Sequence, residues 1–166
     1  MKYTKIINLL LIVSAVNLTL MVPGGFIESR DFSHISSITL GAFNVFLTTL
    51  GMVSLFLVFF IYKKQRWAVW TAIIAGLSYF IIYTIDLAKI FPKSPTQMPP
   101  TLFYLEILGT IIAIPIMYYS VKKLKQSENN NSKLLLNKSI YWLIAIAGLT
   151  GLGIIIFATK SAMTGK

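Results

Sequence analysis

Residues 79–121 read YFIIYTIDLAKIFPKSPTQMPPTLFYLEILGTIIAIPIMYYSV, which is two apolar runs joined by a proline-rich segment. The first run carries Asp86 and the second carries Glu106, so an acidic side chain lies inside each apolar stretch. Each run is long enough to cross a bilayer as a helix, which takes about 20 residues. This stretch therefore predicts a membrane-spanning helical hairpin with one acid in each arm.

The composition of the whole chain supports a membrane protein. Of its 166 residues, 56% are hydrophobic and only 12% are charged, which is far too apolar for a water-soluble domain of this size. The absence of cysteine excludes disulfides and thiolate metal sites, and a single histidine argues against a metal centre. We therefore expect no metal and no cofactor.

Five apolar runs can be marked along the chain, at about residues 6–22, 39–62, 67–91, 102–121 and 139–159. They predict an all-α integral membrane protein with five transmembrane helices in one domain, residues 1–166, with a cytoplasmic linker over 122–138. The first run could instead be a secretory signal. Because its apolar residues continue to Val22 and complete a span, we favour a retained helix.

The positive charges indicate an orientation. With the N-terminus inside, ten Lys and Arg residues face the cytoplasm and five face outward, which predicts an N-in, C-out topology. Because the net charge of +10 is explained by these flanking residues, we expect the lipid bilayer and no nucleic acid as a partner. Small size and short loops lead us to expect a multi-pass protein of the cell membrane, in particular a bacterial inner membrane.

Two segments show an internal similarity. Residues 17–23, NLTLMVP, resemble residues 86–92, DLAKIFP, and both hairpins return through a run with one polar residue near its start, Asn44 or Glu106. Parallel repeats of this kind build some transporter folds. The pattern predicts a four-helix core made of two parallel helical hairpins, with the fifth helix peripheral, although short apolar patterns also recur by chance.

Four polar residues share one depth in these predicted helices. Asn17 and Asp86 each lie six positions before the proline that ends their helix, Asn44 lies six positions after Ile38, and Glu106 lies six positions after Pro100. All four are thus expected roughly 9 Å below the outer boundary. They share helical stripes with small or polar residues, such as Tyr83 beside Asp86, and such stripes face neighbouring helices. We expect this layer to face the bundle interior.

Acids inside a span need a partner. Lys89 lies three residues after Asp86, so a local ion pair is expected there. Glu106 has no basic residue within one turn of its own helix, and it must pair elsewhere, share a proton or stay neutral. Its candidate partners are Lys89, Arg30, His34, Asp86, Asn44 and Tyr104.

The two predicted outer loops differ in character. The first, residues 23–37, opens on a Pro-Gly-Gly turn and mixes polar with apolar residues, which predicts an ordered flap. Its candidate binding residues are Glu28, Arg30, Asp31 and His34, to which we assign no metal. The second, residues 92–100, contains four prolines and should be stiff and extended.

The order Asp86, Pro99-Pro100, Phe103, Glu106 and Pro115 resembles the sterol-isomerase and sigma-2-receptor superfamily. The resemblance implies a helical bundle that holds a lipid-like amine or sterol between acidic residues. It covers residues 86–115, and the spacings and helix order differ from that superfamily, so no residue role is carried over.

These features leave three functional hypotheses. The first is a binding or accessory protein, not an enzyme, with a polar pocket near the outer face for a small amphiphile or a partner helix. It is favoured because the sequence contains no nucleotide loop, nucleophile elbow or metal cluster. The second is a proton- or ion-coupled carrier that works as a homo-oligomer or with a membrane partner protein. The third is an intramembrane enzyme in which Glu106 and Asp86 perform acid–base chemistry.

Overall fold

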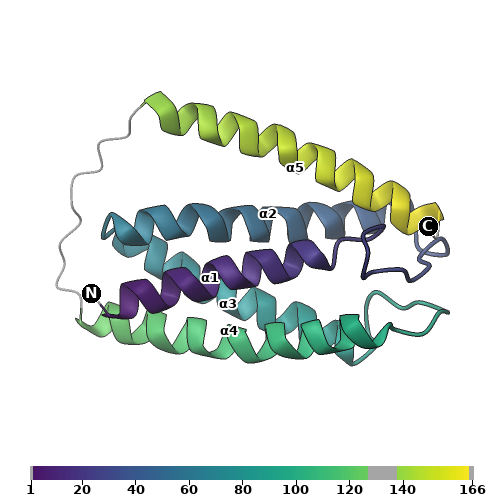
Figure 1. Cartoon of the computed structure of the whole chain (residues 1–166), viewed down its shortest axis with the longest axis horizontal. Helices are drawn as coiled ribbons and strands as arrows, with labels where there is room; N and C mark the ends of the chain where they lie inside the picture. Colours follow the sequence, from purple (N-terminus) through teal and green to yellow (C-terminus); the bar gives the residue numbers. More distant parts are fainter. Residues whose placement is uncertain (1, 127–137, 165–166) are drawn as a thin grey trace.

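The computed structural model describes residues 2–126 and 138–164, and it is all helical (Figure 1). The helices are α1 (Lys2–Leu20), α2 (Ser37–Tyr62), α3 (Arg66–Leu87), α4 (Pro100–Gln126) and α5 (Lys138–Thr164). All five contain a segment long and apolar enough to cross a membrane, which confirms that part of the prediction. Most of the predicted linker, residues 127–137, lies outside the described residues.

Helices α1 to α4 form the body of the bundle. Helix α1 packs against α2 and α4, and α3 packs against α4 and α2, so the four close a ring. Helix α5 packs along α2 and diverges from it toward its N-terminal end (Figure 1). The two hairpins α1–α2 and α3–α4 thus lie together, while their origin by duplication stays a prediction.

Both long loops gather at one end of the bundle, beside the C-terminal end of α5 (Figure 1). Residues 21–36 join α1 to α2, and residues 88–99 join α3 to α4. We call this the loop end, and we call the opposite end, where α4 finishes, the Lys123 end.

The predicted ends of α3 and α4 were wrong by about a turn. Helix α3 ends at Leu87 rather than at residue 91, because Lys89 adopts a positive φ of 55° and its N–H bonds back to the Asp86 carbonyl. Such left-handed residues close helices. Helix α4 continues past residue 121 to Gln126, since lysines are good helix formers and suit a helix C-terminus.

The interior of the ring is filled by apolar side chains spaced three or four residues apart. Ile7 and Leu11 of α1 and Leu57 and Ile61 of α2 are fully or almost fully buried. On the outward faces large apolar side chains are exposed instead, Leu149 to 72%. Exposed apolar faces of this length match the hydrocarbon region of a bilayer.

Glycines allow α3 and α4 to approach closely. A Cβ atom on Gly109 would lie 2.3 Å from the ring of Tyr83, so this ring packs directly on the α4 backbone. The contact places the Tyr83 side chain one turn from Glu106 on α4.

Candidate functional site

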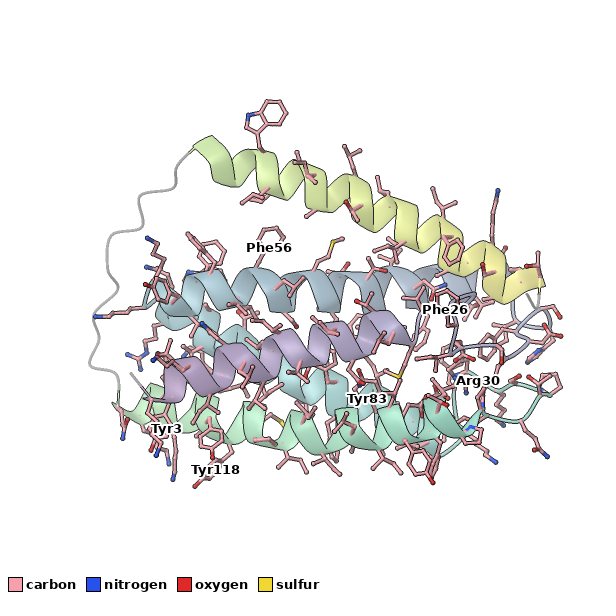
Figure 2. All side chains as sticks on the ribbon, in the orientation of Figure 1. Tyr3, Phe26, Arg30, Phe56, Tyr83 and Tyr118 are labelled. Carbon is pink, nitrogen blue, oxygen red and sulfur yellow. The ribbon has the colours of Figure 1, made fainter. Side chains whose placement is uncertain are left out.

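The loop between α1 and α2 carries Arg30 into the loop end of the bundle (Figure 2). Only 7% of Arg30 is exposed, so a guanidinium group lies inside the protein. The ring of Phe32, whose centroid is 5.2 Å from the Arg30 Cζ, packs on one face of it. A buried guanidinium needs acidic partners, and three acids surround this one.

Arg30 binds two of these carboxylates through several hydrogen bonds. Its Nη1 donates to Asp86 Oδ1 at 2.7 Å and its Nη2 donates to Asp86 Oδ2 at 2.8 Å. Its Nε donates to the two carboxylate oxygens of Glu28 at 2.9 and 3.1 Å. This geometry uses the planar fork of arginine, which a lysine could not reproduce.

The charge of Arg30 is stable in this setting. Burial by itself lowers the pKa of Arg30, but the hydrogen bonds and charges of Asp86 and Glu28 outweigh burial and raise it above its ordinary value. Arg30 therefore stays protonated at any physiological pH.

Glu106 is the third acid, and it is only partly satisfied. Its Oε1 lies 3.8 Å from Arg30 Nη2, while its Oε2 has no hydrogen-bond partner within the described part of the chain. Glu106 is only 2% exposed, so this oxygen is not solvated from outside. We call Glu28, Arg30, Asp86 and Glu106 the acidic cluster. At Glu106 this cluster can accept a proton, a hydrogen-bond donor or a cation.

The side-chain amides of the predicted polar layer, Asn17 and Asn44, are buried and donate hydrogen bonds. Asn17 donates to the Leu105 carbonyl at 3.0 Å and to the Tyr83 hydroxyl at 3.5 Å. Asn44 donates to Thr159 Oγ1 of α5 at 3.1 Å. Neither Asn44 nor Tyr104 bonds to Glu106, contrary to one expectation from the sequence, because Asn44 turns toward α5 and Tyr104 is exposed.

The predicted pairing of Asp86 with Lys89 is wrong. Because α3 ends at Leu87, Lys89 lies outside the helix and is exposed. Asp86 pairs with Arg30 instead, and Lys89 forms no salt bridge with any described residue. The cation that pairs with Asp86 is thus Arg30, from the loop between α1 and α2.

Two of the four predicted flap residues remain outside the acidic cluster. His34 is exposed, and Asp31 lies at the surface, where its carboxylate accepts a hydrogen bond of 2.8 Å from the Ser33 N–H. This backbone hydrogen bond lowers the pKa of Asp31. Only Glu28 and Arg30 reach the interior.

The two loops are bonded to each other, which the sequence did not reveal. Ser94 Oγ donates to the Asp31 carbonyl at 2.9 Å, and the Asp31 N–H donates to Thr96 Oγ1 at 3.1 Å. These bonds hold the segment that carries Arg30 against the proline-rich loop. In the sequence, the one feature that indicates such contacts is the presence of two hydroxyl residues, Ser94 and Thr96, among the prolines of this loop.

A small cavity adjoins the acidic cluster, and a larger groove adjoins that cavity. The first has a volume of about 50 Å³ and is lined by Arg30, Asp86, Glu106, Tyr83 and Asn44 among other residues. The second has a volume of about 350 Å³, is mainly apolar and lies between α1, α2 and α5. Both are lined by Leu18, Met21, Pro23, Asn44 and Leu47, so the small cavity beside the acidic cluster and the apolar groove adjoin each other.

Comparison with known families now places the chain. The sequence profile of a family described as "Domain of unknown function (DUF8051)" matches residues 3–134. The chain belongs to this family. The DUF8051 match includes α1 to α4 and the entire acidic cluster, whereas α5 with Thr159 lies beyond it. No curated protein and no solved structure matches the chain.

Proposed function

We propose that this protein binds a small amphiphile, with the head group of the ligand at Glu106 and its tail in the apolar groove. The observation that carries the proposal is that the two cavities adjoin: a small cavity lined by Glu106, a buried acid with one oxygen that no described residue hydrogen-bonds, shares five lining residues with the apolar groove. Binding sites of this kind combine apolar walls with a few placed polar groups.

The cavity and its charges indicate the kind of head group. About 50 Å³ admits only a small group, and the acceptor available there is an acid oxygen. A head group with hydrogen-bond donors, such as an ammonium or a hydroxyl, complements it. With three acids around one arginine, an ammonium also balances the charge better than an anion does.

The position of the groove supports entry from the bilayer. It is walled by α1, α2 and α5, and its lining includes Val16, Leu55 and Ile154. We place the protein in the cell membrane as a multi-pass, N-in and C-out protein, in particular of a bacterial inner membrane, on the distribution of its lysines and arginines. The loop end is then outside.

An enzymatic role has less support from the geometry. Both oxygens of Asp86 accept hydrogen bonds from Arg30, and Glu106 keeps one buried oxygen that no described donor bonds. A pair of acids that exchange protons with a substrate needs both of them accessible. A partner helix would also be too large for the small cavity.

Photo-crosslinking in lipid nanodiscs tests the proposal. An alkylamine that carries a diazirine in its chain should label groove residues such as Val16 and Ile154, and an excess of unlabelled alkylamine should prevent this labelling. The alkyl carboxylic acid of equal length should label the groove less. Glu106→Gln should weaken amine labelling, while Tyr104→Phe, at an exposed position, should not. Equal labelling of the groove and of lipid-facing residues such as Leu149 would refute the proposal.

A further inference from the structure

A further pocket lies at the loop end, on the proline-rich loop between α3 and α4. It has a volume of about 330 Å³, and all but one of its lining residues belong to that loop. Its polar side chains are those of Arg30, Lys89, Lys93, Ser94, Thr96 and Gln97. Among the described residues no Asp or Glu lines it, so we call it the lysine pocket.

Lys89 and Lys93 are the charged groups that this pocket offers to a ligand. Both are exposed, and within the described ranges neither ammonium group forms a salt bridge or donates a hydrogen bond. The guanidinium of Arg30 is already bound to two carboxylates of the acidic cluster. Asp31, whose backbone is bonded to this loop, accepts the Ser33 N–H with its carboxylate and does not line the pocket. An anion in the pocket would thus meet two ammonium groups and no competing carboxylate of the described chain.

The backbone around both lysines is held in place. Lys89 closes α3 in the left-handed conformation, with its N–H bonded to the Asp86 carbonyl at 2.8 Å. Lys93 lies between Pro92, which is buried and has a fixed φ, and Ser94, which is bonded to the other loop. A site whose backbone is already ordered loses less freedom when a ligand binds.

Membrane topology does not explain these two lysines. In the N-in orientation that we propose, five Lys and Arg residues of the sequence face outward, and three of them line the lysine pocket. Basic residues flanking a span favour the cytoplasmic side. Their concentration in one pocket on the opposite side therefore points to a ligand rather than to orientation.

A second hollow, of about 420 Å³, adjoins the lysine pocket at the start of α4. The two share Lys89, Gln97 and Met98, and the second hollow is also lined by Phe103 and Tyr104. Both aromatic side chains are exposed. Tyrosine at the end of a spanning helix is typical of the level of lipid head groups. A molecule bound at the lysines can therefore place an apolar part against α4.

We propose that the lysine pocket binds a phosphate group at the membrane surface. Three donor side chains without a partner in the described chain, Lys89, Lys93 and Gln97, line the pocket. A phosphate monoester offers three strong acceptor oxygens, one more than a carboxylate. Lysine binds phosphate as a point charge and needs no fixed fork geometry for this. The adjoining aromatic hollow suits a phosphate that is carried by a lipid, whereas a free phosphate ion would use the lysine pocket alone.

This site is separate from the amphiphile site. The lysine pocket shares Arg30 and Pro92 with the small cavity beside the acidic cluster, but neither lysine lines that cavity. The two sites also select opposite charges, because an ammonium head group is repelled by the lysines. Either proposal can therefore fail without the other.

Acylation of lysines, followed residue by residue by mass spectrometry, tests this proposal. The full chain is kept in dodecyl maltoside, which contains no phosphate, and receives phosphatidic acid, diacylglycerol with the same chains, or inorganic phosphate. A sulfonated succinimidyl ester then acylates the exposed lysines. At a concentration of phosphatidic acid about ten times its dissociation constant, acylation of Lys89 and Lys93 should slow by about tenfold, because only the free site reacts. Diacylglycerol lacks the phosphate and should not protect them.

Two exposed lysines outside the pocket serve as internal controls. Lys160 lies near the C-terminal end of α5, beside the loop end (Figure 1), and Lys125 lies at the Lys123 end. Neither lines the lysine pocket or the adjoining hollow, so phosphatidic acid should slow their acylation much less. Lys93→Gln should weaken the protection of Lys89 by about tenfold through loss of one charge-assisted hydrogen bond, while Lys160→Gln should leave it unchanged. Both variants replace an exposed side chain, so both should fold.

The arms of this experiment also identify the source of the phosphate. Protection by phosphatidic acid alone would support a lipid head group, and protection by inorganic phosphate as well would support the phosphate group whatever carries it. Equal slowing of Lys89, Lys93 and Lys160 under every addition, or equal protection by diacylglycerol, would overturn the proposal. Amine labelling of the apolar groove would remain as a separate result in either case.

Discussion

At the scale of single residues, Arg30 organises the site. One guanidinium binds Glu28 on one edge and Asp86 on another, and its Nη2 also approaches Glu106. Removing charges from water is costly, and the cost is offset only when the pairing is geometrically good and further hydrogen bonds are made. The bidentate bonds to Asp86 meet that condition, so the arrangement depends on both partners being present.

The first prediction concerns this pair. Asp86→Asn removes the charge but keeps the shape, and it leaves part of the Arg30 guanidinium without its acceptor. We expect the free energy of unfolding to fall by about 3–5 kcal/mol. Thermal unfolding of the purified protein in detergent measures this loss as a lower midpoint.

Asp31→Asn provides the control for that measurement. Asp31 lies at the surface, and an asparagine oxygen can still accept the bond from the Ser33 N–H. Its midpoint should stay close to that of the wild type, within about 0.5 kcal/mol. Equal midpoints for the Asp86 and Asp31 variants would show that the buried pair does not stabilise the fold.

At the scale of helices, the contact of α3 with α4 positions the polar groups. The ring of Tyr83 packs on the backbone at Gly109, and a Cβ on Gly76 would lie 3.3 Å from the Ala113 carbonyl. Small residues at a crossing let two helices approach closely in a membrane. This approach allows the Tyr83 hydroxyl to reach past α4 to Asn17 on α1.

The second prediction compares two glycines within helices. Gly109→Ala puts a methyl group into the Tyr83 ring, and overpacking of this kind costs about 1–3 kcal/mol. Gly148→Ala adds the same methyl on α5, where no atom lies within 4 Å, so the higher helix propensity of alanine should leave stability unchanged or slightly raised. Unfolding midpoints distinguish the two. A Gly109 variant as stable as the Gly148 variant would mean that the α3–α4 contact is loose.

At the scale of the whole molecule, α5 is attached through the flap as well as through α2. The Phe32 N–H donates to the Ala162 carbonyl at 3.2 Å, and Asn44 bonds to Thr159. Gly24 has a φ of +80°, and a Cβ there would lie 2.2 Å from Ser161. The fifth helix, expected at the periphery, is thus bonded at its C-terminal end to the segment that carries Arg30.

The third prediction concerns the orientation of the molecule. Because the chain has no cysteine, single cysteines can be placed without background. His34→Cys, at the exposed loop end, should react with a membrane-impermeant maleimide on intact cells. Lys125→Cys, exposed at the end of α4, should react only after lysis. The reverse pattern would show that the N-terminus is outside.

The sequence by itself determined the helices and the inward direction of their polar residues. The apolar runs could be recognised by their length, because the thickness of a bilayer sets how many residues each helix needs. Helical periodicity placed Asn17, Asn44, Asp86 and Glu106 on inward stripes, and all four are buried. These properties depend on residues close together in the chain.

Only the tertiary structure decided which groups meet. Lys89 is the basic residue nearest to Asp86 in sequence, yet the helix ends before it and the side chain turns to the surface. Arg30 is 56 positions away from Asp86 and Thr159 is 115 positions away from Asn44, and both reach their partners. Such pairings depend on how loops fold back over the bundle, and that path is set by the sum of many distant contacts rather than by any local pattern.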